Sequence, residues 1–186
     1  MRIVLLRHGK PHLTSPKRIK ARNMQHWIDN YNTAELDTSA SPSTELIELA
    51  TQCQQIVCSN QSRSLDSAKV LNLNTVHESD PLFREFGMPY RKIPFVKLTP
   101  TLWAIIFRLS WLMGFSLNSE SFEEAKIRAE NAANRLIKMA EDHNDILLIG
   151  HGLLNKFIAK QLLSEGWSCS KMLGRKHWEY GIFEKE

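Results

Sequence analysis

The stretch Ile3-Val4-Leu5-Leu6-Arg7-His8-Gly9 stands at the start of the chain and passes from four apolar residues to arginine, histidine and glycine. Four consecutive apolar residues predict a buried strand of the kind that a parallel sheet covers on both faces. In open α/β sheets, ligands bind beyond the carboxyl ends of the strands. We therefore expect Arg7 and His8 to lie at a sheet edge where an anion can bind.

The same pattern returns near the other end of the chain. Ile146-Leu147-Leu148-Ile149-Gly150-His151-Gly152 is again an apolar strand that ends in histidine and glycine. A shorter apolar run, Ile56-Val57-Cys58, leads through the turn-rich residues Ser59–Ser62 to Arg63. The three patterns predict one site built from distant parts of the sequence.

Helical and extended patterns alternate along the rest of the chain. Two helices are expected from their start signals, one at Ser41-Pro42 and one at the capping box Ser121-Phe122-Glu123-Glu124. Three more are expected over the ranges Arg63–Leu71, Pro100–Gly114 and Leu153–Leu163. Further short strands are expected at Leu73–His77 and, at a sheet edge, at Trp178–Phe183. This alternation predicts a single α/β domain over residues 1–186, a three-layer α/β/α sandwich with a largely parallel central sheet. Within it, Glu124 and Arg128 are spaced to form an ion pair on a helix surface.

Composition sets limits on the class of protein. Hydrophobic residues make up 42% of the chain and charged residues 24%, which is typical of a globular domain. The formal charge of +4 is uneven, because residues 1–28 hold seven basic side chains and no acidic one. That segment is either a solvated surface or a region that attracts phosphate, nucleic acid or an anionic membrane. Its basic run Lys17–Arg22 lacks aromatic interleaving and any nucleic-acid motif, so no nucleic-acid partner is expected.

Three cysteines, Cys53, Cys58 and Cys169, form no CxxC pair. This pattern argues against a zinc site and fits a reducing compartment. The apolar run after Met1 is too short for a secretion signal, and the apolar stretch Leu102–Phe115 is too short to span a membrane. We expect a cytoplasmic protein with no integral membrane segment and no metal or other cofactor.

Arginines and histidines at strand ends point to phosphate chemistry. Arg7 and Arg63 offer forked donors that match phosphate oxygens, and helix N-termini beside Arg63 and His151 favour an anion. A phosphate pocket needs no histidine, yet His8 and His151 are both present. Neutral imidazole can act as a nucleophile toward phosphorus, and nearby arginine cations favour that neutral form.

These residues resemble the histidine phosphatase (phosphoglycerate mutase-like) superfamily, in its phosphatase branch. The resemblance is carried by Leu6-Arg7-His8-Gly9, by the run Ser59 to Ala68 that contains Arg63, and by Gly150-His151-Gly152. It implies that His8 is the nucleophile that becomes phosphohistidine, and that Arg7, Arg63 and His151 complete the phosphate pocket. Glu85, in Leu-Phe-Arg-Glu-Phe-Gly, matches the family's proton donor, with Glu78 and Asp80 as nearby alternatives. The family works without a metal.

Two segments depart from the family pattern. Lys10-Pro11-His12 replaces the usual residues after Arg-His-Gly, and Gly87–Lys92 replaces the common Gly-x-Trp-Glu-Gly run. Both changes weigh against a sugar-phosphate mutase. A metal-independent phosphatase acting on a small phosphorylated substrate or a phosphoprotein is therefore expected first. A phosphomutase and a non-catalytic phosphate-binding module are the alternatives.

Residues 88–118 lie where this family often carries a substrate-selecting insertion, and we expect a helical lid or insertion there. Its apolar part, Leu102–Phe115, can also be core packing, a membrane-lying face or the face of a homodimer. Lys10 and His12 either face the substrate or are exposed loop residues. The remaining histidines, His26, His77, His143 and His177, show no partners in the sequence and are expected to be structural or solvent-facing.

Overall fold

The structure is a computed structural model that covers residues 1–186. Its strands are β1 Arg2–Arg7, β2 Ile19–Lys20, β3 Gln55–Ser59, β4 Glu78–Asp80, β5 Lys97–Leu98, β6 Asp145–Gly150, β7 Ser168–Lys171 and β8 Tyr180–Glu184. Its α-helices are α1 Met24–Thr33, α2 Thr44–Gln52, α3 Ser62–Val70, α4 Pro100–Leu112, α5 Phe122–His143 and α6 Gly152–Ser164. Single 3-10 turns occupy Ala21–Asn23 and Pro81–Phe83.

Six strands form the central sheet in the order β4-β3-β6-β1-β8-β7. The first four strands in this order run parallel, and β8 runs antiparallel to both of its neighbours, β1 and β7. β1 and β6 pair along their whole length, from Arg2 opposite Asp145 to Arg7 opposite Gly150. The predicted α/β fold with a largely parallel central sheet is confirmed.

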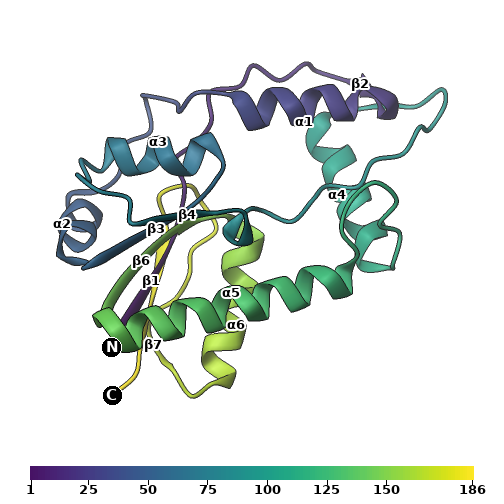
Figure 1. Cartoon of the computed structure of the whole chain (residues 1–186). Coiled ribbons are helices and arrows are strands. Elements are labelled where there is room, and N and C mark those ends of the chain that lie inside the picture. Colours follow the sequence, from purple (N-terminus) through teal and green to yellow (C-terminus); the bar gives the residue numbers. More distant parts are fainter.

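Alternate residues of the strands point to two separate hydrophobic cores, as the pleat of a sheet requires. Ile3 and Leu5 of β1 pack with α5 and α6 on one face. Val4 and Leu6 pack with α2 and α3 on the other face. Figure 1 shows the sheet between these two pairs of helices. The apolar strands are buried on both sides, which explains their nearly continuous hydrophobic sequence.

Local sequence signals predict the start of α5 correctly and that of α2 incorrectly. Ser121 caps α5 by accepting a hydrogen bond from the backbone N–H of Glu124, and the Glu124 carboxylate accepts one from the N–H of Ser121, so the predicted capping box is confirmed. The start of α2 differs from the prediction at Ser41-Pro42. Ser43 is its N-cap, because the Ser43 hydroxyl accepts the hydrogen bond from Leu46.

Two strand predictions are wrong. Leu73–His77 forms no strand, and the chain joins the sheet only afterwards, at β4. The tail strand β8 does not lie at the sheet edge, because β1 pairs with one side of it and β7 with the other. Its inner position follows from burial of Tyr180 and Phe183, which pack on opposite cores. The unpredicted β7 forms that edge instead.

A third, smaller hydrophobic cluster lies apart from the sheet. Trp103 and Phe107 of α4 stack on each other and pack with Ala21 and Met24, next to the two-stranded sheet of β2 and β5. Residues 17–33 and 88–118 together form this part of the molecule, which we call the cap. Figure 1 shows α1 and α4 of the cap beyond one end of the sheet. No helix of the protein combines the length and the hydrophobicity needed to cross a membrane.

Candidate active site

The functional residues meet because their strands are parallel neighbours. β3, β6 and β1 lie side by side, so their carboxyl ends share one edge of the sheet. His8 follows β1, His151 follows β6 as the N-cap of α6, and Arg63 lies in the first turn of α3, after β3. The imidazole centroids of His8 and His151 are 5.0 Å apart. The sequence motifs therefore converge on one site.

His8 has a defined tautomer. Its Nδ1 lies 2.6 Å from the carbonyl oxygen of Gly9, which can only accept, so Nδ1 carries the proton. The lone pair is then on Nε2, which accepts a 3.1 Å hydrogen bond from Nε of Arg63. Both side chains are almost fully buried, at 2% and 3% exposure. The nitrogen of His8 that faces Arg63 is therefore a free base.

The charge state of His8 agrees with this geometry. Burial lowers the pKa of His8 well below its usual value, and the Arg63 cation lowers it further. Burial and Arg63 act in the same direction on the pKa of His151. Both imidazoles are therefore neutral near pH 7, the form in which a ring nitrogen can act as a nucleophile.

Arg63 is held by residues that sequence reasoning did not select. Its two terminal nitrogens donate to Oδ1 of Asn32 at 3.0 Å and to Oε1 of Gln61 at 2.7 Å. The guanidinium also lies over the ring of Tyr31, 5.2 Å from its centroid. Asn32 and Tyr31 belong to α1, so a helix of the cap helps to orient an arginine of the site. No local motif marks these residues.

His151 is completely buried and has one unpartnered nitrogen. Its Nε2 lies 2.8 Å from the hydroxyl oxygen of Ser59, the first residue of the turn-rich run that leads to Arg63. That hydroxyl accepts a hydrogen bond from the N–H of Gln61, so its own hydrogen can be donated to His151. Such a bond leaves a proton on Nδ1 of His151, and Nδ1 is buried without a partner.

Arg7 donates hydrogen bonds to two residues near the C-terminal end of the chain. One terminal nitrogen donates to the carbonyl of Arg175, and the other donates to Nε2 of His177 at 3.2 Å. Its Nε is buried without a partner. A Cβ at Gly152 would lie only 3.3 Å from this Nε, so glycine at the start of α6 allows the guanidinium to approach the helix end closely.

His177 corrects an expectation. It was expected to be structural or solvent-facing, but its ring lies 5.3 Å from that of His8 and accepts a hydrogen bond from Arg7. Burial, together with the cations of Arg7, Lys10 and Arg63, lowers the pKa of His177 to about 4. It is neutral near pH 7 and able to accept. The sequence does not indicate this role, because His177 lies in an irregular loop before β8 and belongs to no periodic pattern.

Glu85 lies against the amino terminus of α6, the helix that begins directly after His151. Its two carboxylate oxygens accept hydrogen bonds of 3.1 Å from the backbone N–H groups of Leu153 and Leu154. A third 3.1 Å bond comes from the N–H of Phe86. These bonds fix the Glu85 carboxyl group at the first turn of α6, whose N-cap is His151.

A clamp of charged residues fixes the segment that carries Glu85. Arg128 of α5 donates to both carboxylate oxygens of Glu120, at 2.9 and 2.6 Å, and to the carbonyl oxygens of Leu82 and Arg84. Glu120 also accepts from the N–H of Gly87. Partial burial raises the pKa of Glu120, but bonds from Arg128 and Gly87 outweigh burial and leave that pKa below its usual value.

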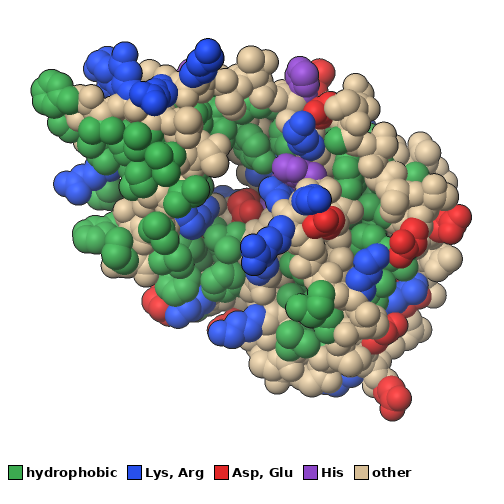
Figure 2. Space-filling view, turned by 180° about the vertical axis from the view of Figure 1, so that it is seen from behind, with side chains coloured by type: hydrophobic (Ala, Val, Ile, Leu, Met, Phe, Trp, Pro, Cys, Tyr) green, Lys and Arg blue, Asp and Glu red, His purple; other side chains and the backbone are tan.

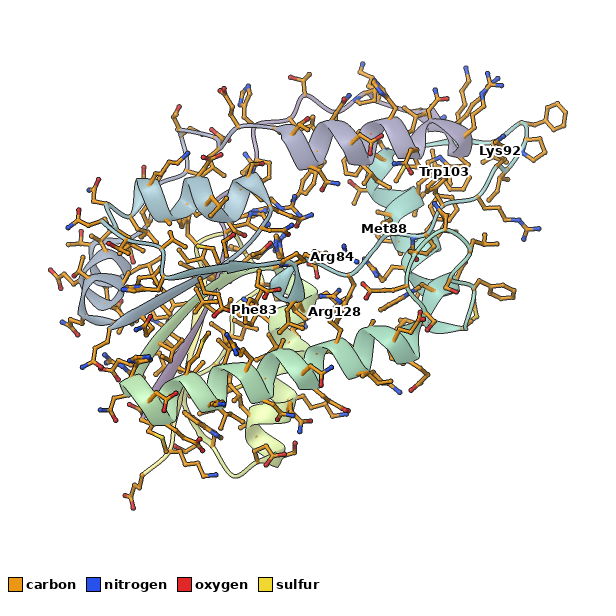
Figure 3. All side chains as sticks on the ribbon, in the orientation of Figure 1. Phe83, Arg84, Met88, Lys92, Trp103 and Arg128 are labelled. Carbon is orange, nitrogen blue, oxygen red and sulfur yellow. The ribbon has the colours of Figure 1, made fainter.

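The predicted pair of Glu124 with Arg128 is therefore wrong. Glu124 closes the capping box, and Glu120 offers Arg128 a two-pronged contact that Glu124 cannot match. In Figure 3, Arg84 and Arg128 lie between the end of the sheet, α5 and the cap. Figure 2 shows a hollow in this part of the molecule with cationic, acidic and histidine side chains around it.

Two further expectations concerned charges and metals. Lys10 forms a 2.8 Å ion pair with Asp37, and His12 is exposed. The structure contains no group of three or more His, Cys, Asp or Glu side chains arranged to hold a metal ion. The residues that gather at the site are arginines, histidines and one carboxylate, a set suited to a phosphoryl group.

The model of the histidine phosphatase superfamily (branch 1) matches residues 3–177, from the first strand to His177. The chain belongs to the histidine phosphatase superfamily. As a histidine phosphatase it is an enzyme of the phosphatase class. No curated protein sequence matches it significantly.

Solved structures share the fold of this histidine phosphatase. The product of the Mycobacterium tuberculosis open reading frame Rv3214 is 19% identical, with a TM-score of 0.60, and the match covers 100% of this chain and 91% of that chain. The α-ribazole phosphatase of Shigella flexneri is 14% identical, with a TM-score of 0.57 and the same coverage. A mycobacterial glucosyl-3-phosphoglycerate phosphatase is 20% identical, with a TM-score of 0.55, and 88% of this chain and 79% of that chain are covered.

Proposed function

We propose that the protein hydrolyses phosphate monoesters without a metal, through a phosphohistidine on His8. The observation that carries this proposal is the hydrogen bond between Arg63 and His8. It leaves the basic Nε2 of a neutral imidazole next to a guanidinium that can bind phosphate oxygens. The nucleophile, His8, and the side chain that binds the phosphate, Arg63, are therefore already adjacent.

Formation of the phosphoenzyme is the first step. The lone pair on Nε2 of His8 attacks phosphorus while the bond from phosphorus to the ester oxygen breaks. The Nδ1 proton of His8 stays on its hydrogen bond to Gly9, which stabilises the positive charge that the ring acquires. Arg63 turns its Nε donor from His8 to a phosphate oxygen. The unpartnered Nε of Arg7 and Nδ1 of His151 supply further contacts for the phosphoryl oxygens.

Glu85 completes the proton balance. As a carboxylic acid it gives its proton to the departing ester oxygen, which leaves as an alcohol. The resulting carboxylate then takes a proton from the water that attacks phosphorus. The bond from phosphorus to Nε2 breaks, its electron pair returns to His8, and inorganic phosphate departs. The enzyme regains its starting state with one ester bond hydrolysed.

The setting of this reaction follows from the same residues. Charge stabilisation comes from arginines and histidines, so no cofactor is part of the proposal. The named contacts recognise the phosphoryl group and not the rest of the substrate. Both a small phosphorylated molecule and a phosphoprotein are therefore substrates of the proposed class. Three free thiols, at Cys53, Cys58 and Cys169, suit the reducing cytoplasm, where we place the enzyme.

Hydrolysis of an aryl phosphate by the purified protein, with and without a chelator, tests the proposal. We expect turnover that survives the chelator and disappears in His8→Ala. The exposed His143→Ala variant is the control for loss of a histidine as such. Brief reaction and acid-free denaturation should trap a phosphoryl group on the wild-type protein and none on His8→Ala. Full activity in His8→Ala would exclude the mechanism.

The products separate the two alternatives. A phosphomutase returns an isomer of the substrate, whereas a phosphatase releases inorganic phosphate. A non-catalytic phosphate-binding module binds phosphate but gives neither turnover nor a trapped phosphoenzyme. Release of inorganic phosphate in proportion to substrate consumed is the result that supports the proposal.

A further inference from the structure

The outer face of α4 is apolar and exposed. Leu102, Ile105, Leu109 and Leu112 are 42–54% exposed, and their spacing of three and four residues places them on one side of the helix. Trp103, Phe107 and Trp111 occupy the opposite side and are buried. The buried side packs the helix against the rest of the protein, and the stripe leaves a large apolar area in contact with solvent.

The apolar surface continues beyond α4. Nine of the thirteen large hydrophobic side chains that the protein exposes lie between residues 95 and 117. Phe95 is 96% exposed, and Met113, Phe115 and Leu117 are 58–71% exposed. Such a concentration marks an interaction site, because scattered exposed residues are what an ordinary surface shows. Figure 2 shows the hydrophobic side chains gathered over this end of the molecule, with lysine and arginine side chains beside them.

The cap is also strongly basic. Residues 17–33 and 88–118 hold eight lysines and arginines and one acidic residue, Asp29. Their formal charge is therefore +7, while the whole chain carries +4 and the remainder carries −3. The basic run noted in the sequence and the apolar insertion belong to the same part of the structure.

None of these cap cations forms an ion pair with an acidic side chain. The ion pairs of the protein lie elsewhere, and of the eight only Arg108 makes a side-chain hydrogen bond, to backbone carbonyls. Lys20 and Lys97 are directly paired across β2 and β5, so their side chains share one face of the ribbon. The neighbouring pair, Ile19 and Leu98, packs against the cap's hydrophobic cluster. Two like charges placed side by side and pointing outward repel each other unless an anion neutralises them.

We propose that the cap docks the enzyme onto the surface of an anionic lipid bilayer. Exposed leucine, isoleucine and phenylalanine side chains enter the boundary of the acyl chains, while the lysines and arginines contact the negative headgroups. An anionic bilayer accounts for both the exposed apolar side chains and the unpaired cations of the cap. A nucleic acid would match the cations but would leave the apolar stripe uncovered. An apolar protein surface would leave the cations without counter-charges.

A second copy of the chain fits this face less well. An interface formed by two caps would bring two surfaces of formal charge +7 together, and like charges across an interface are unfavourable. The docking is peripheral, because α4 spans only residues 100–112 and no helix of the protein can cross a membrane. The inference goes beyond the phosphatase reaction and does not depend on it.

Co-sedimentation of the full chain with vesicles tests this docking. One set of vesicles contains phosphatidylcholine alone, and the other contains phosphatidylcholine with phosphatidylglycerol. We expect binding to the mixed vesicles that weakens as salt is added, and little binding to phosphatidylcholine. Each basic residue near the surface contributes about a fivefold factor in partitioning, so Lys92→Glu and Lys97→Glu should each lower it by at least that much.

Apolar and control variants complete the test. Ile105→Glu with Leu109→Glu should abolish binding to the mixed vesicles, while hydrolysis of a soluble aryl phosphate stays at the wild-type rate. Ile127→Glu and Lys138→Glu, two exposed positions on α5 outside the cap, should change neither. Absence of binding, equal binding to both vesicle types, or equal loss in the control variants would overturn the proposal. A stable dimer that Leu109→Glu dissociates, without vesicle binding, would assign the face to a second copy instead.

Discussion

Arg7 and His177 lie 170 residues apart in the sequence and share a 3.2 Å hydrogen bond at the active site. The guanidinium can only donate, so Nε2 of His177 is the acceptor and must be unprotonated. Arg7 sits at the end of β1, and His177 comes shortly before β8, the strand that returns beside β1. The antiparallel return of the chain thus supplies the residue that orients one arginine of the site.

The titration of His177 predicts a pH-dependent stability. Its pKa is lowered from 6.5 to about 4 in the folded protein, so the unfolded chain binds a proton more readily over that interval. The contribution of neutral His177 to the free energy of unfolding is therefore fully present above pH 6.5, and it is lost as the pH falls toward 4. His177→Gln keeps an acceptor for Arg7 but does not titrate. We expect its unfolding free energy to fall less steeply with pH, by up to about 1.4 kcal/mol per pH unit. Parallel curves for both proteins would contradict this.

Gly152→Ala should weaken phosphate binding and leave the fold intact. The new Cβ would lie 3.3 Å from Nε and 3.4 Å from Cζ of Arg7, which forces the guanidinium to move. Because hydrogen bonds to charged groups are worth about 1.5–3 kcal/mol, we expect the inhibition constant of inorganic phosphate to rise about tenfold. Competition assays measure that constant, and chemical denaturation measures stability. Unchanged inhibition would show that Arg7 does not bind the phosphate.

The thiols should differ sharply in reactivity. Burial raises the pKa of Cys58 to about 12 and that of Cys53 to about 11, whereas Cys169 is partly exposed. Because the thiolate is the reactive form, alkylation of the two buried thiols should be slower than that of Cys169 by at least about a hundredfold. Mass spectrometry after a short alkylation should find one modified cysteine in the native protein and three after unfolding. Cys169→Ser should remove the fast reaction.

Much of the fold and the site can be predicted because its signals are local. The apolar runs at residues 3–6 and 146–149 identify the central strands, and the polar residues that end them identify the strand tips. Parallel neighbours bring their tips to the same edge, so His8 and His151 meet without further information. The capping box at Ser121 is likewise complete within four residues.

Features that depend on distant partners escape such prediction. The strand β8 looks like an edge strand from its alternation, but its position is decided by pairing with β1 at the other end of the chain. His177 enters the site only through that pairing. Arg128 has Glu124 at helical spacing, yet it bonds to Glu120 because the loop before α5 brings both carboxylate oxygens into reach. Local spacing offers possible partners, and tertiary packing selects among them.

The contact between Arg128 and Glu120 predicts a selective loss of activity. Arg128→Lys keeps the charge but cannot bind Glu120 and the carbonyls of Leu82 and Arg84 together, so the segment that carries Glu85 loosens. Because a misplaced acid fails most where the leaving oxygen needs a proton, hydrolysis of alkyl phosphates should fall roughly tenfold to a hundredfold. Nitrophenyl phosphate, whose leaving group needs little protonation, should be hydrolysed at nearly the wild-type rate.

The same substitution at Arg135 is the matched control. Arg135 lies on the same helix and forms an ion pair with Glu78, but its side chain is 51% exposed and bonds to neither Leu82 nor Arg84. Exposed ion pairs contribute little, so Arg135→Lys should change neither rate. Stopped or continuous assays with both substrates give the ratio of the two rates for each variant. An equal loss with both substrates in Arg128→Lys would mean that Arg128 supports the site as a whole, and the specific link from Arg128 to Glu85 as the proton donor would be wrong.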